Sequence, residues 1–332
     1  MPSADDPKAA TGTGLTLSGG GALASQRRGF SSWKVTGRWA NDCEDREKCM
    51  ESEPLIEAIN GASRLIVLSP HLDDAVLSCG ALMNHARTET SVTVVTFFTE
   101  GGEPPYTYGA RRYLHKTRDR HANSLFLARR AEDQAVLEGA GISYVHVGLK
   151  EILFRRRIQP LLNQFPWASR LIPELSYAYP TLHLHVLRGG ISPDDLSTIR
   201  CILDTIDRLS LESSTLFLAP LGVGGHKDHI LVRTGAELSR KRVAYYSDFP
   251  YNTLYSVDLS FVQRNSLMQT TWSRDVAAKL PLIRAYRTQV DALFSKGKIP
   301  VVPETYYYPT ADNYPNRHPA AATYASYGRA EY

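Results

Sequence analysis

Short apolar runs alternate with longer amphipathic segments from residue 62 onward. Runs such as 65–69 and 92–98 are apolar at nearly every position, which is typical of strands buried on both faces of a sheet. Further strands are predicted at 144–147, 216–219 and 243–246. Helical spacing of apolar residues predicts helices at 75–87, 118–138, 193–211, 227–240 and 274–294. This alternation predicts right-handed crossovers, a mainly parallel sheet and a three-layer α/β/α fold.

Residues 1–50 have a different composition. They are rich in Gly, Ala, Ser and Thr and show neither helical nor strand periodicity, so we expect a mostly disordered extension. Residues 51–332 are expected to form a single domain. The pair Arg27 and Arg28 is not followed by an apolar stretch, so the sequence does not support a twin-arginine export signal.

The overall composition excludes several classes of protein. With 43% hydrophobic and 22% charged residues, the 332-residue chain is too apolar for a disordered protein. No stretch approaches the roughly 18 uninterrupted apolar residues of a membrane-spanning helix. The formal charge of +4 is low for a nucleic-acid-binding protein. Four cysteines without a CxxC pair suit a reducing compartment, so we expect a cytoplasmic protein.

The positive charge is concentrated in one segment. Residues 111–130 contain seven Lys and Arg against a single acid, Asp119. Such a run is typical of a solvated helix face, and the alternative is a rim that attracts an anionic substrate such as a phosphosugar.

The first chemically informative motif follows the first predicted strand. His71, Asp73 and Asp74 lie where that strand ends and a helix begins, and ligand sites form at the carboxyl ends of parallel strands. Adjacent carboxylates repel each other, and a divalent metal would relieve this repulsion. His71 and Asp74 can reach one ion while Asp73 points to another side. The alternative is that Asp73 and Asp74 are the N-cap and first-turn acids of the helix.

The second motif, residues 224–229, again follows a buried strand and precedes a helix. It brings His226 and His229 to the same edge of the predicted sheet as His71, although it could also be a polar loop with a helix cap. Two His and one Asp with an open fourth position are typical of a catalytic zinc site.

At these residues the chain resembles the PIG-L/LmbE family of zinc-dependent N-deacetylases. Residues 70–74 resemble the family motif His-Pro-Asp-Asp, with Leu72 in place of the usual proline, and residues 226–229 match His-x-Asp-His. Weaker matches extend the resemblance over about residues 63–310. The segment at about 151–190 has no counterpart in the family and is expected to be an insert that shapes the substrate site.

The resemblance implies a role for each motif residue. His71, Asp74 and His229 would bind one Zn²⁺ per chain, Asp73 would be the general base, and His226 would stabilise the transition state. A protonated His226 with a pKa near or above about 6.5 could donate to the oxyanion. Asp228 is either a partner that orients a histidine or a cap or first-turn acid of the helix.

Four further residues are expected to contact the substrate. Glu103 follows the second strand at the same sheet edge, and Arg129 belongs to a weak family match. Tyr106 and Tyr108 offer aromatic faces on which sugars pack. His183 and His185 are interpreted as surface histidines of a strand.

The sequence therefore predicts a cytoplasmic Rossmann-like zinc hydrolase. It would remove an N-acetyl group from a small-molecule amino sugar or its conjugate, including one from antibiotic or other secondary-metabolite biosynthesis. The alternatives are an amidase acting on a thiol conjugate or glycopeptide, and a noncatalytic metal- or sugar-binding protein, which would need neither Asp73 nor His226.

Overall fold

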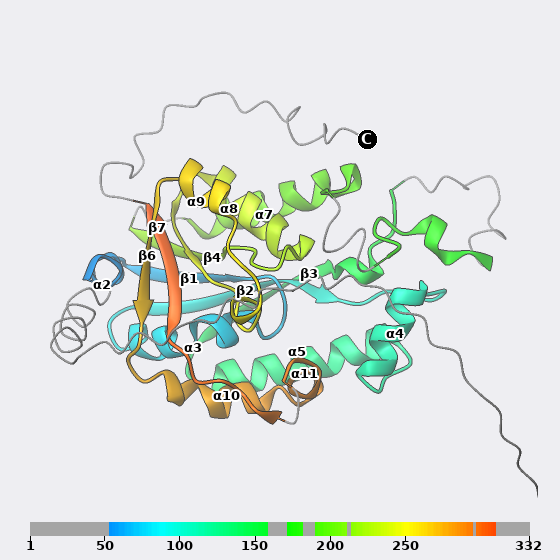
Figure 1. The fold of residues 1–332 in the computed structure, drawn as a ribbon, viewed down its shortest axis with the longest axis horizontal. Coiled ribbons are helices and arrows are strands. Elements are labelled where there is room, and N and C mark those ends of the chain that lie inside the picture. The colour runs from blue at the N-terminus through cyan, green and yellow to red at the C-terminus, as the bar shows by residue number, and fades with distance from the viewer. Residues whose placement is uncertain (1–52, 159–170, 182–189, 211–213, 295–296, 310–332) are drawn as a thin grey trace, which may run out of the picture. The chain divides into compact units, whose positions relative to one another are not determined.

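The computed structural model describes residues 53–158, 171–181, 190–210, 214–294 and 297–309. Within them, seven strands form one sheet in the order β3-β2-β1-β4-β5-β7-β6 (Figure 1). The strands are β1 (Arg64–Ser69), β2 (Ser91–Glu100), β3 (Ser143–Lys150), β4 (Thr215–Pro220), β5 (Arg242–Tyr246), β6 (Leu267–Trp272) and β7 (Glu304–Pro309). Strands β1 to β5 are parallel, whereas β7 runs antiparallel to both β5 and β6.

The predicted α/β class with a mainly parallel sheet is confirmed. The five strands predicted from apolar runs are the five parallel strands. Strands β6 and β7 were not predicted, because β6 is half exposed and polar in its middle, and because β7 is a tyrosine-rich run without an aliphatic core pattern.

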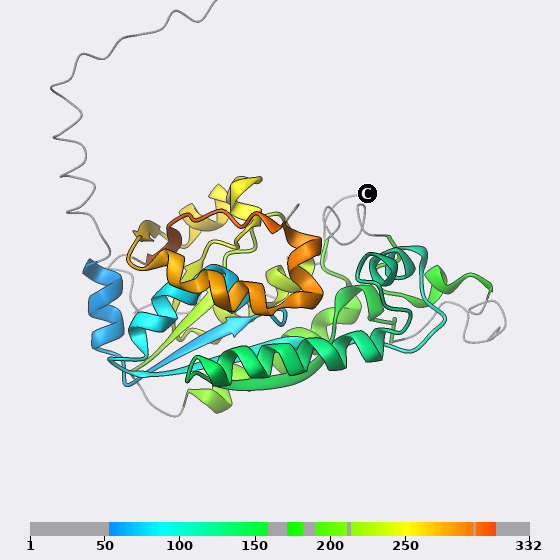
Figure 2. The same ribbon diagram turned by 90° about the horizontal axis from the view of Figure 1, so that it is seen from below.

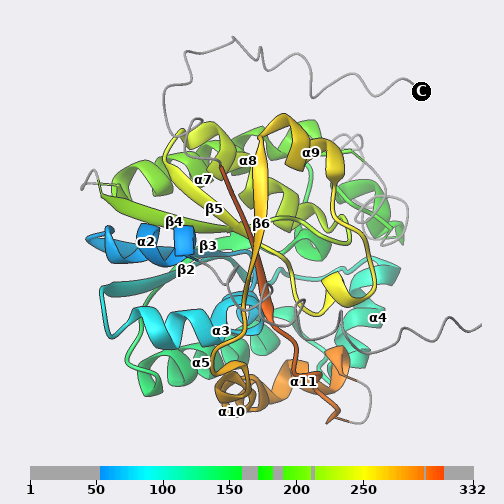
Figure 3. The same ribbon diagram turned by 60° about the vertical axis from the view of Figure 1, so that its left-hand side comes forward.

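Helices cover both faces of the sheet (Figures 2 and 3). One face packs against α2 (Glu53–Asn60), α3 (Asp74–Ala86), α5 (Ala122–Gly139), α10 (Leu280–Ala285) and α11 (Arg287–Leu293). The other packs against α7 (Leu196–Leu209), α8 (Lys227–Ser239) and α9 (Leu259–Arg264). In β1, Leu65 and Val67 face the first layer while Ile66 and Leu68 face the second. A strand with both faces buried needs apolar residues at every position, which explains the continuous run in the sequence.

A smaller apolar cluster lies beside the carboxyl ends of the strands. It joins α4 (Tyr108–Lys116) and the start of α5 to the 3₁₀ turn η1 (Ile152–Phe154) and to Tyr179. The further 3₁₀ turns are η2 (Pro173–Ser176), η4 (Pro193–Asp195), η5 (Tyr251–Thr253) and η6 (Val276–Lys279). The described part of the expected insert is therefore packed against the domain next to the site. The 1–50 extension, the rest of that insert, and His183 and His185 lie outside the described residues.

The two longest predicted helices begin or break elsewhere than expected. The segment 274–294 is divided into η6, α10 and α11, and it turns at Tyr286, whose ψ is 65°. The helix predicted from residue 118 begins at Ala122, because the Asp119 carboxylate accepts the backbone N–H groups of Arg120 and His121 in a turn. No helix of the described residues is long and apolar enough to span a membrane.

Candidate active site

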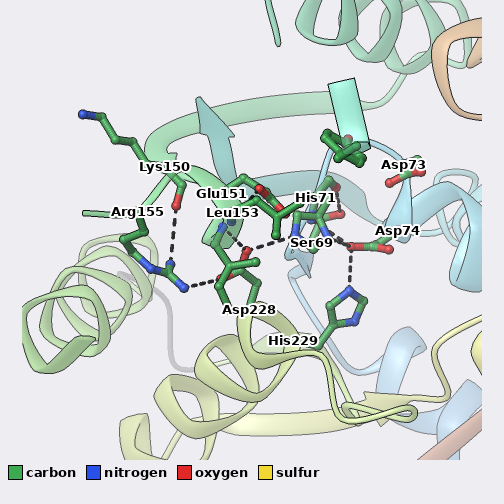
Figure 4. Close-up of polar contacts among 12 residues, drawn as sticks. Ser69, His71, Asp73, Asp74, Lys150, Glu151, Leu153, Arg155, Asp228 and His229 are labelled. Atoms are coloured by element: carbon green, nitrogen blue, oxygen red, sulfur yellow. Dashed lines mark hydrogen bonds and ion pairs between the residues drawn. The ribbon is translucent and has the colours of Figure 1, made fainter. Parts of the chain in front are cut away.

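The two predicted motifs meet at one edge of the sheet. His71 and Asp74 follow β1, His229 lies in the first turn of α8 after β4, and β1 and β4 are parallel neighbours (Figure 4). The turn after β1 is held by Ser69, whose hydroxyl donates to the His71 carbonyl (2.7 Å) and accepts the N–H of Ala75 (3.1 Å). This local network fixes the backbone of the turn that carries the motif.

Asp74 lies between two histidines. Its Oδ2 is 3.1 Å from His71 Nδ1 and 3.3 Å from His229 Nε2. His229 Nε2 is buried and has no hydrogen-bond partner in the described residues. Ligand atoms that share a tetrahedral zinc with bonds of about 2.0–2.1 Å lie about 3.3 Å apart, so both spacings fit a common ion. In the described residues, the three-residue sets whose ligand atoms all lie within 4.8 Å of one another are His71, His226 and His229, and His71, Glu151 and Asp228, so spacing alone admits His226 as a ligand.

The three histidines differ in the partner of their other ring nitrogen. His71 Nε2 contacts Asp228 Oδ2 (3.1 Å), and His229 Nδ1 contacts Asp248 Oδ1 (2.6 Å). Metal-binding histidines usually have such a carboxylate partner, which fixes the tautomer and the ring orientation. His226 Nδ1 is buried without any hydrogen-bond partner in the described part of the chain. The donor set therefore favours His71 and His229 over His226 as metal ligands.

Asp228 contacts the other motif rather than its own helix. It lies in the first turn of α8, and it is fully buried. Its oxygens receive the backbone N–H of Ile152 (3.0 Å) and the guanidinium of Arg155 (2.7 Å) in addition to His71. These contacts favour the interpretation of Asp228 as a histidine-orienting residue.

Asp73 occupies the N-cap position of α3 but does not cap the helix with its side chain. The side chain lines the pocket, and Oδ1 is 4.0 Å from the Arg129 guanidinium. Figure 4 shows Asp73 apart from the contacts that join Asp74 to His71 and His229. Burial and the charge of Asp74 raise the pKa of Asp73 to about 7, although Arg129 opposes the shift. Asp73 is thus a carboxylate that can exchange a proton near neutral pH.

The neighbouring carboxylates favour positive charge at the centre of the cluster. Burial lowers the pKa of His71, but Asp228 and Asp74 outweigh burial and raise it to about 10. Burial would raise the pKa of Asp74, but His229 and His71 hold it well below its usual range. The surplus of negative charge in this cluster can be balanced by two protons on the histidines or by one divalent cation. A bound cation would therefore displace those protons.

His226 departs from the expectation of a cationic histidine. Burial, together with the positive charge of His71, lowers its pKa well below 6.5. A metal ion beside His71 would repel a proton on His226 in the same way. His226 is therefore neutral, and any hydrogen bond that it donates comes from the single N–H of a neutral ring.

A pocket of about 120 Å³ opens beside these residues. Its walls come from α3, α4, α5, α11, η5 and the segment after β3, and it is lined by His71, Asp73, Asp74, Leu77, Tyr113, Thr117, Arg129, Glu151, His226, Pro250, Tyr251, Thr288, Gln289, Ala292 and Leu293. The basic run lies partly on α4, where Arg111, Arg112 and Lys116 are exposed while Tyr113 and Thr117 face the pocket.

Of the four predicted substrate-binding residues, only Arg129 lines the pocket. Arg129 lines the pocket and donates to the Tyr113 hydroxyl (2.7 Å). Tyr106 is buried in the apolar cluster and donates to the Gly102 carbonyl, whereas Tyr108 is exposed; neither lines this pocket. The Glu103 carboxylate accepts from Asn123 and also lies outside the pocket lining. Contacts of these three residues with a substrate remain predictions.

Several site residues were given no role in the site from the sequence, although Asp248 and Gln289 lie in two of the weaker family matches. Asp248 follows β5, and Glu151 follows β3, at the same edge as the two motifs, and that position after a strand is the signal that could have found them. Burial and the charge of Asp228 raise the pKa of Glu151 to about 7. Gln289, which donates to the Leu72 carbonyl (2.7 Å) and accepts from Arg129, comes from a helix whose placement depends on tertiary packing.

Comparisons with known proteins identify the family and the fold of the chain. The sequence model of the PIG-L family, described as GlcNAc-PI de-N-acetylase, matches residues 66–238, just over half of the chain and both motifs. No curated protein matches the chain in sequence. A crystal structure of the zinc-inhibited form of teicoplanin deacetylase is 22% identical, covers 74% of this chain and 97% of its own, and has a TM-score of 0.58. A crystal structure of the A40926 pseudoaglycone deacetylase is also 22% identical, covers 74% of this chain and 97% of its own, and has a TM-score of 0.54. At this identity, the likeness establishes the shared fold.

Proposed function

We propose that this protein hydrolyses the N-acetyl group of an amino sugar or amino-sugar conjugate and uses one zinc ion per chain. The chain belongs to the PIG-L family of GlcNAc-PI de-N-acetylases and is an N-deacetylase. The proposal rests on the position of Asp74 between His71 and His229, each of which contacts a further carboxylate through its other ring nitrogen. Next to Asp74 lies Asp73, whose side chain does not cap its helix. A protein that only binds metal or sugar needs no such free carboxylate next to the ligands.

The metal ligands in this proposal are His71 Nδ1, Asp74 Oδ2 and His229 Nε2. The assignment is supported by the distances from Asp74 Oδ2 to the two ring nitrogens, and by the lack of a hydrogen-bond partner for the buried His229 Nε2 among the described residues. Zinc bound there would lower the pKa of a water molecule toward about 7 and polarise the acyl carbonyl. Three protein ligands leave a position open, as a catalytic site requires.

Asp73 acts as the general base and then as the general acid. Its raised pKa lets it accept the proton of the attacking water and return a proton to the departing amine. Arg129, at 4.0 Å, keeps part of the Asp73 population ionised near neutral pH. Deacylation then gives acetate and a free amino group.

His226 stabilises the oxyanion as a neutral donor. Its ring lines the pocket next to His71, and the centroids of the two rings are 5.0 Å apart. A fixed donor aimed at developing negative charge strengthens its hydrogen bond as the transition state is reached. This role needs no positive charge on the imidazole.

The experiment is an acetate-release assay on N-acetylated amino sugars, nucleotide sugars and glycosylated antibiotics, with wild-type protein and Asp73→Asn. We expect the variant to keep its zinc and to lose about 10²–10⁴-fold in turnover, because an amide cannot accept the proton of water. Asp204→Asn, a change at an exposed position on α7, is the matched control and should leave turnover unchanged.

Two results would contradict the proposal. If zinc-loaded Asp73→Asn turns over within about threefold of wild type, Asp73 is not the base. If zinc-loaded wild-type protein releases acetate from none of these classes, the substrate class is wrong.

A further inference from the structure

Arg155 connects the segment after β3 to the metal-site histidine through one intermediate residue. Its side chain is buried, and its terminal nitrogen donates to Asp228 Oδ1 at 2.7 Å. Arg155 Nε lies 3.0 Å from Asp195 Oδ1, beside the start of α7. The guanidinium also packs over the rings of Phe98 and Tyr179, with its carbon 5.0 and 5.5 Å from their centroids. The orientation of this group is therefore fixed on several sides.

Asp228 uses its two oxygens for different partners. Oδ1 receives Arg155, while Oδ2 receives the N–H of Ile152 at 3.0 Å and contacts His71 Nε2 at 3.1 Å. Anchors on both oxygens fix the plane of the carboxylate, and Figure 4 shows the resulting chain of contacts from Arg155 to His71. Without Arg155, only Oδ2 would have partners among these groups, so the carboxylate could rotate away from the histidine.

We infer that Arg155 is a positioning residue for His71, and that it raises metal affinity by fixing the Asp228 carboxylate. The inference rests on the proposed assignment of His71 as a ligand, and it extends the assignment to a segment without a counterpart in the family motifs. Orienting partners of metal-binding histidines typically contribute about 10–100-fold to metal affinity. Arg155 acts one residue further out, on the orienting partner itself.

Arginine suits this position and lysine does not. The planar guanidinium holds its nitrogens in a rigid fork: a terminal nitrogen donates to Asp228, while Nε lies 3.0 Å from Asp195 as an ion pair without hydrogen-bond geometry. An ammonium group is a point charge on a flexible stem, without a plane that fixes the direction of its contact with Asp228. Replacing arginine by lysine therefore removes the group that orients Asp228 but keeps the positive charge. The charge must be kept because losing a cation would by itself strengthen the binding of a nearby metal ion.

The test is the zinc dissociation constant, measured by chelator competition on the full chain. We expect Arg155→Lys to weaken zinc binding by about tenfold or more. Arg156→Lys is the matched control: Arg156 is the next residue, is exposed, and contacts the Glu103 carbonyl and the Tyr177 ring instead. The control should bind zinc as wild type does. Arg155→Gln replaces Arg155→Lys if that variant does not fold; it should also weaken zinc binding, but by less, because it removes a cation as well as the orienting group.

A double-mutant cycle shows whether Arg155 acts through Asp228. In an Asp228→Asn background, Arg155→Lys should change zinc affinity by less than about twofold, because the carboxylate that it orients is gone. Equal losses in both backgrounds would overturn the inference, as would wild-type affinity in Arg155→Lys. Wild-type protein that binds no zinc would instead overturn the proposed metal centre, so the two failures are distinguishable.

Discussion

The protonation of Asp73 determines the expected pH dependence of the enzyme. Burial and Asp74 raise its pKa to about 7, so the base form is lost as the pH falls through this region and activity should rise with pH. Arg129, 4.0 Å away, lowers this pKa. Arg129→Met should therefore move the acid limb of kcat/KM upward by about one pH unit. Bound zinc would move the acid limb of both proteins to lower pH, and Arg129→Met would still shift the limb upward relative to wild type.

The measurement is a kcat/KM profile between about pH 5 and 9 for wild type and both arginine variants. Arg130→Met is the matched control, since Arg130 is adjacent but contacts the Thr99 carbonyl and Glu100 outside the pocket. An acid limb that stays in place in Arg129→Met would show that Arg129 does not act on the base.

The residues of both motifs could be predicted because each motif directly follows an apolar strand. Position after a parallel strand specifies the sheet edge, so His71, Asp74 and His229 could be placed together without a structure. The partners that orient them could not all be found this way. Arg155 reaches Asp228 across 73 positions of the chain, and only the packing of the intervening segment brings them together. The charge state of His226 also depends on burial, which a local pattern does not reveal.

At the scale of elements, the contact between α7 and α8 supports the second motif. Gly235 of α8 lies so close to α7 that an added Cβ would be 2.4 Å from Ile202 Cγ2. Gly235→Ala should destabilise the fold by about 1–3 kcal/mol, because overpacking exceeds the roughly 1 kcal/mol that alanine gains in a helix. Urea denaturation measures the difference.

Gly139→Ala is the matched control for this helix contact. Gly139 ends α5, and nothing lies within 4 Å of an added Cβ. Its variant should be neutral or more stable by up to about 1 kcal/mol. Equal stability of the two variants would mean that α7 moves away from α8 at no cost.

The division of the 274–294 segment shows where periodicity misleads. Its apolar spacing is compatible with one helix, yet the chain turns at Tyr286, whose hydroxyl donates to Asp133 (2.7 Å). Glu132 then accepts the N–H and hydroxyl of Thr288 at the start of α11. Two acids on α5 thus fix the break, and the break directs Gln289 into the site. Such long-range partners cannot be read from the local pattern of a single segment.

At the scale of the whole described part of the chain, the proposed metal site and the apolar cores are separate. The two large cores lie on the two faces of the sheet, while His71, Asp74 and His229 lie at the carboxyl ends of its strands. His71 and His229 are also held by contacts with Asp228 and Asp248 that need no metal ion. A chelator should therefore abolish activity and leave the far-ultraviolet circular dichroism unchanged.

Zinc should still stabilise the folded state, because it binds only the native arrangement of its ligands. At a free concentration about 100 times the dissociation constant, this linkage contributes about 2.7 kcal/mol, so the unfolding midpoint should rise on zinc addition. Activity should return with the added metal. Thermal scans and acetate release, measured on the same chelated and reloaded samples, check both effects. Loss of the circular dichroism signal on chelation would instead show that zinc holds the fold together, which an ion at the edge of two complete apolar cores should not need to do.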